Sequence, residues 1–86
     1  MQKSMFSCFD SKAGVFSSPF TSINSNVALR DFSMAASDPN SQISQYPEDY
    51  ILYEIATFDD STGVITEIAP PINLGHASQF KILQEG

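Results

Sequence analysis

Length, composition and charge narrow what this chain can be. Its 86 residues are 42% hydrophobic and 12% aromatic, which suits one small core. The sequence contains no run of about 18 apolar residues, the length that a membrane-spanning helix needs. Four basic residues stand against ten acidic ones, and so few cations under a net charge of −6 argue against autonomous, tight binding of a phosphate backbone.

The start of the chain and its cysteine content indicate the compartment. The first residues lack the apolar stretch of about 7–15 residues that a secretory signal needs. Cys8 is the only cysteine and cannot form an internal disulfide, so a stapled secreted miniprotein is not expected. We therefore expect a cytosolic single domain over residues 1–86, with residues 1–3 and 84–86 frayed.

The first predicted element is a strand over residues 5–10, which are rich in aromatic and apolar side chains. Residues 11–14 predict a turn, because Gly14 can adopt a positive φ. Residues 15–16 continue as a short second strand or an extended arm. Pro19 ends this segment, since proline has no N–H to donate to a strand ladder.

The clearest helix is predicted over about residues 25–37. Asn24 or Ser25 can act as the N-cap and accept from a free N–H of the first turn. Asp38 precedes a proline and therefore avoids the helical region, which ends the helix. One apolar, alanine-rich stripe recurs at helical spacing and favours packing on a sheet: Ala28, Leu29, Phe32, Ala35 and Ala36.

A hairpin is predicted after a polar connection over residues 39–46. Residues 50–58 give the strongest strand signal, since β-branched and aromatic side chains dominate them. Residues 59–63 contain a glycine and form the turn, and residues 64–68 return as the partner strand. Residues 69–71, Ala-Pro-Pro, close that strand, and residues 76–83 predict a short helical turn or strand.

These elements predict the α+β class. We expect a small antiparallel sheet, made of the N-terminal strand or hairpin and the 50–58/64–68 hairpin, packed by the helix over about residues 25–37.

The central predicted strand is apolar on both faces. One face carries Tyr50, Leu52, Ala56 and Phe58, and the other carries Ile51, Tyr53 and Ile55. One helix covers one face only, so a second layer is needed. Either another copy of the chain covers the second face, as a homodimer, or the C-terminal segment does so with Ile72, Leu74, Phe80 and Ile82.

The sequence carries few signs of a catalytic site. The chain has one cysteine and one histidine, and Cys8 and His76 could in principle pair as nucleophile and base, but no third residue accompanies them to orient the base. Cys8 lies in an apolar strand, where a buried thiol is inert, and His76 fits a surface or capping position. We expect no enzyme activity and no catalytic residue.

Metal and cofactor motifs are also lacking in the sequence. The Asp59–Gly63 run offers oxygen ligands, but it lacks the spaced calcium series and suits a hairpin turn. No zinc ligand set is present. The glycines are isolated, so they form neither a phosphate loop nor a dinucleotide fingerprint, and we expect no metal and no cofactor.

Six of the ten acidic residues lie between positions 48 and 67, where Lys and Arg do not occur. Such a charge run commonly serves solubility alone. The alternative is a surface for a basic protein partner, with Glu48, Asp49, Asp59 and Asp60 as its candidate residues. A further alternative is stacking of single-stranded DNA bases on aromatic side chains, namely Phe6, Phe9, Phe16, Phe20 and Tyr46.

Several short motifs occur in a specific order. Residues 47–54 read Pro-Glu-Asp-Tyr-Ile-Leu-Tyr-Glu, residues 58–63 follow as Phe-Asp-Asp-Ser-Thr-Gly, and residues 9–14 read Phe-Asp-Ser-Lys-Ala-Gly. Together with Pro19-Phe20, Asp38-Pro39 and Pro71-Ile72-Asn73-Leu74-Gly75, they resemble the small non-structural protein of microviruses, the tiny single-stranded DNA phages, especially the gokushovirus group. The resemblance covers roughly residues 5–81, although residues 22–26 are more polar than the usual basic helix entry.

The resemblance implies a role outside the virion, in the host bacterial cytoplasm. The family is likened to the product that moves related phages from double-stranded replication to single-stranded genomes for packaging. That role implies binding to a viral or host replication or packaging protein, and it supplies no catalytic residue. Two alternatives stay open, a direct single-stranded DNA-binding protein and a host-directed inhibitor.

Overall fold

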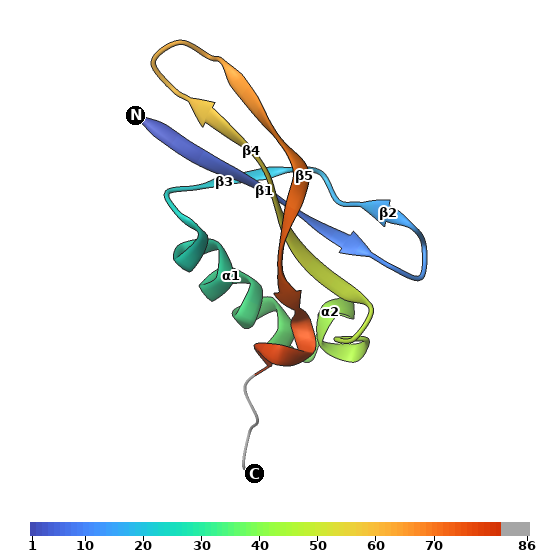
Figure 1. Cartoon of the computed structure of the whole chain (residues 1–86). Helices are drawn as coiled ribbons and strands as arrows, with labels where there is room; N and C mark the ends of the chain where they lie inside the picture. The colour runs from blue at the N-terminus through green and yellow to red at the C-terminus, as the bar shows by residue number, and fades with distance from the viewer. Residues whose placement is uncertain (82–86) are drawn as a thin grey trace.

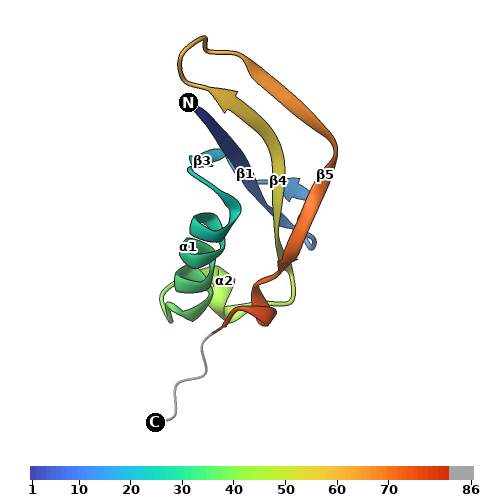
Figure 2. The same ribbon diagram turned by 60° about the vertical axis from the view of Figure 1, so that its left-hand side comes forward.

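The structure, a computed structural model, describes residues 1–81. A five-stranded antiparallel sheet has the order β2-β1-β4-β5, and β3 also pairs with β1. Figures 1 and 2 show both α-helices on the same side of this sheet. The predicted α+β class is therefore confirmed. The elements are β1 (Gln2–Asp10), β2 (Val15–Phe16), β3 (Phe20–Ser22), α1 (Ser25–Ser37), α2 (Gln42–Gln45), β4 (Tyr50–Asp59), β5 (Ile65–His76) and the 3-10 helix η1 (Ala77–Gln79).

Strand β1 begins earlier than the prediction over residues 5–10. Gln2 pairs with Asp59 and Lys3 pairs with Phe58, so residues expected to fray lie in the ladder with β4. The tertiary partner explains the difference, because β4 is long enough to pair with these polar residues. The expectation that residues 84–86 fray lies outside the described residues.

Helix α1 has the predicted bounds, Ser25–Ser37. Its N-cap is Asn24, whose Oδ1 accepts from the Val27 N–H at 2.9 Å. The helix ends at Asp38, whose N–H donates to the carbonyl of Ala35. The predicted apolar stripe packs on the sheet, and a buried cluster forms there: Phe6, Ala28, Phe32, Ala36, Leu52 and Ala77.

The connection over residues 39–46 is not wholly irregular, because it contains the short helix α2. Ser41 caps this helix, since its Oγ accepts from the Ser44 N–H at 3.1 Å. Its hydroxyl also donates to the Ala35 carbonyl at 2.5 Å, which ties α2 to the end of α1. Ile43 then packs against the core. The helix could not be predicted from the polar composition of this segment, in which Ile43 is the one branched aliphatic side chain.

Strand β5 continues past the prolines that we expected to close it. Glu67 pairs with Ala56 and Ile72 pairs with Glu54, so residues 68–71 stand opposite Ile55 alone. This excursion holds a cis Ala69–Pro70 bond. Because β5 is an edge strand, no neighbouring strand on its outer side requires an N–H donor from the prolines. Pairing with β4 resumes at Ile72.

Two residues of the C-terminal segment that was expected to cover the second face, Leu74 and Phe80, pack instead against the core on the α1 side, and the Phe80 ring lies 6.2 Å from that of Phe32. Ile72 is 46% exposed, and Ile82 lies outside the described residues. The homodimer suggested by this face stays a prediction.

Candidate functional site

The structure divides the four candidate acidic residues into two groups. Glu48 and Asp49 precede β4, whereas Asp59 ends that strand and Asp60 follows it. A ten-residue strand separates its ends by roughly 30 Å. The four carboxylates therefore cannot form one continuous surface, and the partner-binding role must be considered for each group separately.

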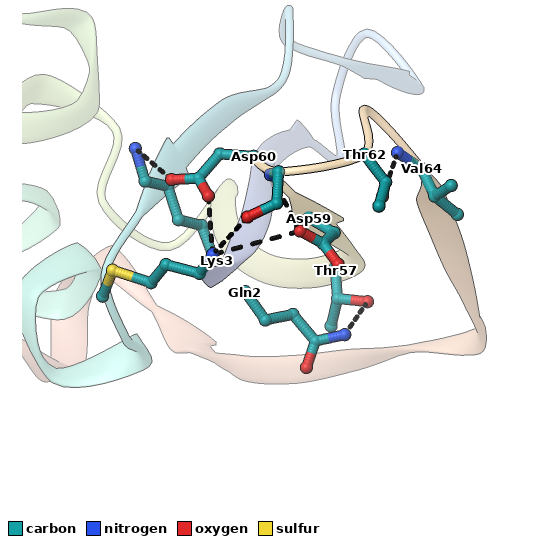
Figure 3. A network of polar contacts seen from close by, with 9 residues as sticks. Gln2, Lys3, Thr57, Asp59, Asp60, Thr62 and Val64 are labelled. Carbon is teal, nitrogen blue, oxygen red and sulfur yellow. Dashed lines mark hydrogen bonds and ion pairs between the residues drawn. The ribbon is translucent and has the colours of Figure 1, made fainter.

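The Asp59–Asp60 group is engaged within the chain (Figure 3). The Met1 amino group donates to Asp60 Oδ1 at 2.7 Å, and Lys3 Nζ lies 3.7 Å from Asp60 Oδ2. The hydrogen bond from Met1 is the main cause that lowers the pKa of the Asp60 carboxyl. Asp59 Oδ1 accepts from the Ser61 N–H, as a turn residue does. This group fastens the β4–β5 turn to the start of β1.

The Glu48–Asp49 group borders a hollow of about 270 Å³ at the opposite end of β4. The hollow is lined by Asp10, Lys12, Gln42, Tyr46, Asp49 and Tyr50. Desolvation, followed by the charge of Asp10, raises the pKa of the Tyr50 phenol. An adjoining hollow shares Tyr46 and Asp49 and adds Glu48. Acidic side chains and half-exposed tyrosines thus gather where β1 ends and β4 begins.

An apolar hollow of about 350 Å³ lies next along the same strands. Its walls come from β1, β3, both helices and β4, namely Cys8, Phe20, Phe32, Ala35, Ile43 and Leu52, with Asp31 and Ser17 also lining it. Burial raises the pKa of the Cys8 thiol to about 11. Sequence reasoning missed this hollow, although Ile43 within a polar segment was a signal for it.

The Cys8–His76 pair that the sequence allowed does not come together. Cys8 lies on β1 and His76 on β5, with β4 between them. Two strand spacings amount to roughly 10 Å. His76 is the N-cap residue of η1, and its N–H donates to Gln79 Oε1 at 2.8 Å. A capping position for His76 is thus what the structure shows.

Over residues 1–81, no three His, Cys, Asp or Glu side chains gather closely enough to hold a metal ion. No helix there has the length and apolar character to cross a bilayer.

The four cations lie on separate parts of the fold. Lys3 faces Asp60, Arg30 Nε lies 4.0 Å from Asp31, and Lys81 Nζ donates to the Ser44 carbonyl. Lys12 borders the acidic hollow. A basic track for a phosphate backbone needs several cations on one face, and this arrangement does not provide one.

The candidate stacking aromatics are also dispersed. Phe6 is fully buried, with the Phe20 ring at 5.7 Å. Phe9 and Phe16 lie together on the second face of the sheet, whereas Tyr46 borders the acidic hollow. These rings do not make one platform.

Comparison with known proteins identifies the family. The sequence model of the family described as Phage ORF5 protein matches residues 3–80. The chain belongs to this family. The Phage ORF5 assignment confirms a phage protein, as the resemblance implied. Neither the curated proteins nor the solved structures contain a match to the chain.

Proposed function

We propose that this Phage ORF5 protein is a non-structural accessory protein of a gokushovirus-type microvirus. It regulates genome replication or the packaging of single-stranded DNA in the host bacterial cytoplasm. It acts by binding a viral or host replication or packaging protein, without catalysing a reaction. Membership of a phage family supports the setting, and the resemblance over residues 5–81 supports the microvirus role.

The arrangement of charges is the main observation in favour of action through binding to a protein. The net charge is −6. Lys3 is paired with Asp60, and Lys81 donates a hydrogen bond to the Ser44 carbonyl. A negative surface repels phosphates and attracts basic protein surfaces. The open hollows near Glu48 and Asp49 offer places for such contacts.

Titration of labelled single-stranded DNA with the full chain, at low and at moderate salt, tests this mechanism. We expect no binding at micromolar protein at either salt. Micromolar binding with a steep loss of affinity on adding salt would instead favour the direct DNA-binding alternative, because counterion release produces that slope.

Charge reversal tests where the partner binds. We expect Glu48→Lys with Asp49→Lys to weaken capture of a basic protein from infected-host lysate without unfolding the domain. The pair Asp59→Lys and Asp60→Lys changes the net charge equally and acts as the comparison, since these carboxylates are engaged with Met1 and Lys3. Equal capture by all three proteins would remove the acidic surface from the proposal, and capture from uninfected host alone would favour the inhibitor alternative.

A further inference from the structure

The apolar hollow and the acidic hollow are lined by neighbouring residues on one side of the sheet. Cys8 pairs with Leu52, and two residues further along β1, Asp10 pairs with Tyr50. Residues two apart on a strand face the same side and lie roughly 7 Å apart. Helix α2 borders both hollows, because Gln42 lines the acidic one and Ile43 the apolar one.

We propose that these two hollows form one docking groove for a segment of a basic partner protein. The segment presents a large apolar side chain and, about two residues on in an extended chain, a basic side chain. This inference rests on the proposed function, since it assumes a protein partner and describes its chemistry.

The apolar end is built to receive a side chain. Its floor is Leu52, which is fully buried, and Phe32, which is 5% exposed. A volume of about 350 Å³ lies at the small end of the range for binding pockets, about 300–1,000 Å³. Such a space fits one aromatic or large aliphatic group. Burial of that group is the main source of affinity.

The acidic end selects for a cation. Asp10 and Asp49 line it, and Glu48 lines the hollow beside it. Among the described residues that line either hollow, Lys12 is the one with a basic side chain. Tyr50 lines the same hollow, and its pKa is raised first by desolvation, with the negative charges of Asp10 and Asp49 adding to the shift. Asp31 adds a carboxylate at the apolar end.

Charge complementarity favours a basic protein segment over other occupants. A nucleic-acid backbone would bring phosphates against the four carboxylates named above. A second copy of this chain would bring a net charge of −6 against the same groups. A segment that combines an apolar side chain with Lys or Arg satisfies both halves of the groove.

Two short synthetic peptides provide the probe. The first carries phenylalanine and, two residues on, arginine, and the second has glutamate in place of that arginine. Binding to the full chain is followed by NMR chemical shifts, because two anchoring side chains give only about millimolar affinity. We expect the arginine peptide to bind about tenfold more tightly than the glutamate peptide.

Matched variants locate the binding. Ala35→Trp fills the apolar hollow and abolishes binding of the arginine peptide, whereas Met34→Trp, at a side chain that is 64% exposed on the same helix, leaves it intact. Asp49→Asn reduces the preference for arginine. Glu67→Gln removes the same charge from exposed β5 and does not. Thermal unfolding shows that each variant is folded.

Three results would overturn the groove: no saturable shift with the arginine peptide, equal binding of the two peptides, or equal effects of Ala35→Trp and Met34→Trp. Such a failure is distinct from failure of the proposed function, which the DNA titration tests without peptides. If the chain binds neither DNA nor the peptides, the proposed partner-binding role stands and only the groove proposal is rejected.

Discussion

At the scale of single residues, Phe32 joins the two halves of the core. Its ring is 5% exposed and lies against Phe80, which brings the C-terminal segment onto α1. We expect Phe32→Ala to lower the free energy of unfolding by about 3–5 kcal/mol. Since small domains have roughly 5–15 kcal/mol in total, the variant can fail to fold.

Urea unfolding measures this effect. Met34→Ala is the control, because Met34 is 64% exposed on the same helix and its truncation should stay within about 0.5 kcal/mol of the parent. A Phe32→Ala chain as stable as the Met34→Ala chain would show that the core does not depend on this ring.

Cys8 gives a prediction that depends on pH. With its pKa raised to about 11 by burial, the thiol should react with iodoacetamide at pH 8 roughly a hundredfold more slowly than a thiol with an ordinary pKa. Alkylation rates followed by mass spectrometry between pH 7 and about 10 test this. A rate that levels off near pH 9 would contradict the raised pKa.

The raised pKa of Cys8 also makes the free energy of unfolding depend on pH, because the folded chain favours the neutral thiol. The contribution is fully present below the ordinary pKa of 9.0 and is lost as the pH rises through about 11. Wild type should therefore lose stability in this range relative to Cys8→Ala. Parallel stability curves for the two proteins would refute the linkage.

At the scale of elements, the corner between β5 and η1 decides where the C-terminal segment packs. Gly75 has φ +130°, and a Cβ there would lie 2.5 Å from Gln79 Oε1 and 2.8 Å from the Phe80 ring. The same Gln79 oxygen accepts from the His76 N–H. A side chain at this position would thus disturb both the cap of η1 and the contact of Phe80 with the core.

We expect Gly75→Ala to cost about 1–3 kcal/mol more than Gly14→Ala, measured by urea unfolding. Gly14 also has a positive φ, +71°, but a Cβ there meets nothing within 4 Å. The greater loss expected at Gly75 has two sources: the close contacts of the added Cβ, and a φ of +130°, which lies further from the left-handed helical region than the +71° of Gly14. Equal losses would mean that the corner adjusts without cost.

At the scale of the whole molecule, neighbouring aromatic side chains on the second face of the sheet predict self-association. The Phe16 ring lies 4.7 Å from Phe9 and 5.6 Å from Tyr53, and Phe16 is 49% exposed. These rings carry no charge, so two acidic copies can meet there without opposing like charges directly.

Light scattering after size exclusion tests this association. We expect a mass near twice 9.4 kDa at roughly ten micromolar or above, and a return to the monomer on Phe16→Ser. The groove lies on the α1 side of the sheet, so Phe16→Ser should leave peptide binding unchanged. A strict monomer for the wild type over this range would contradict the homodimer.

Local signals in the chain are enough to predict several parts of the fold. Asn24 and the Asp38-Pro39 pair fix the ends of α1, since capping and the restriction before proline act within a few residues. Alternating apolar residues and the Asp-Asp-Ser-Thr-Gly turn specify the β4–β5 hairpin. The net charge of −6 and the presence of one cysteine likewise follow from the sequence without a structure.

Features that depend on pairing between distant segments could not be predicted from local patterns. The start of β1 and the continuation of β5 past Pro71 follow from the registers with β4, which no local pattern contains. The length of β4 separates Asp59 and Asp60 from Glu48 and Asp49. The groove arises because the register of β1 on β4 sets Cys8 and Asp10 beside Leu52 and Tyr50, and α2 then closes over them.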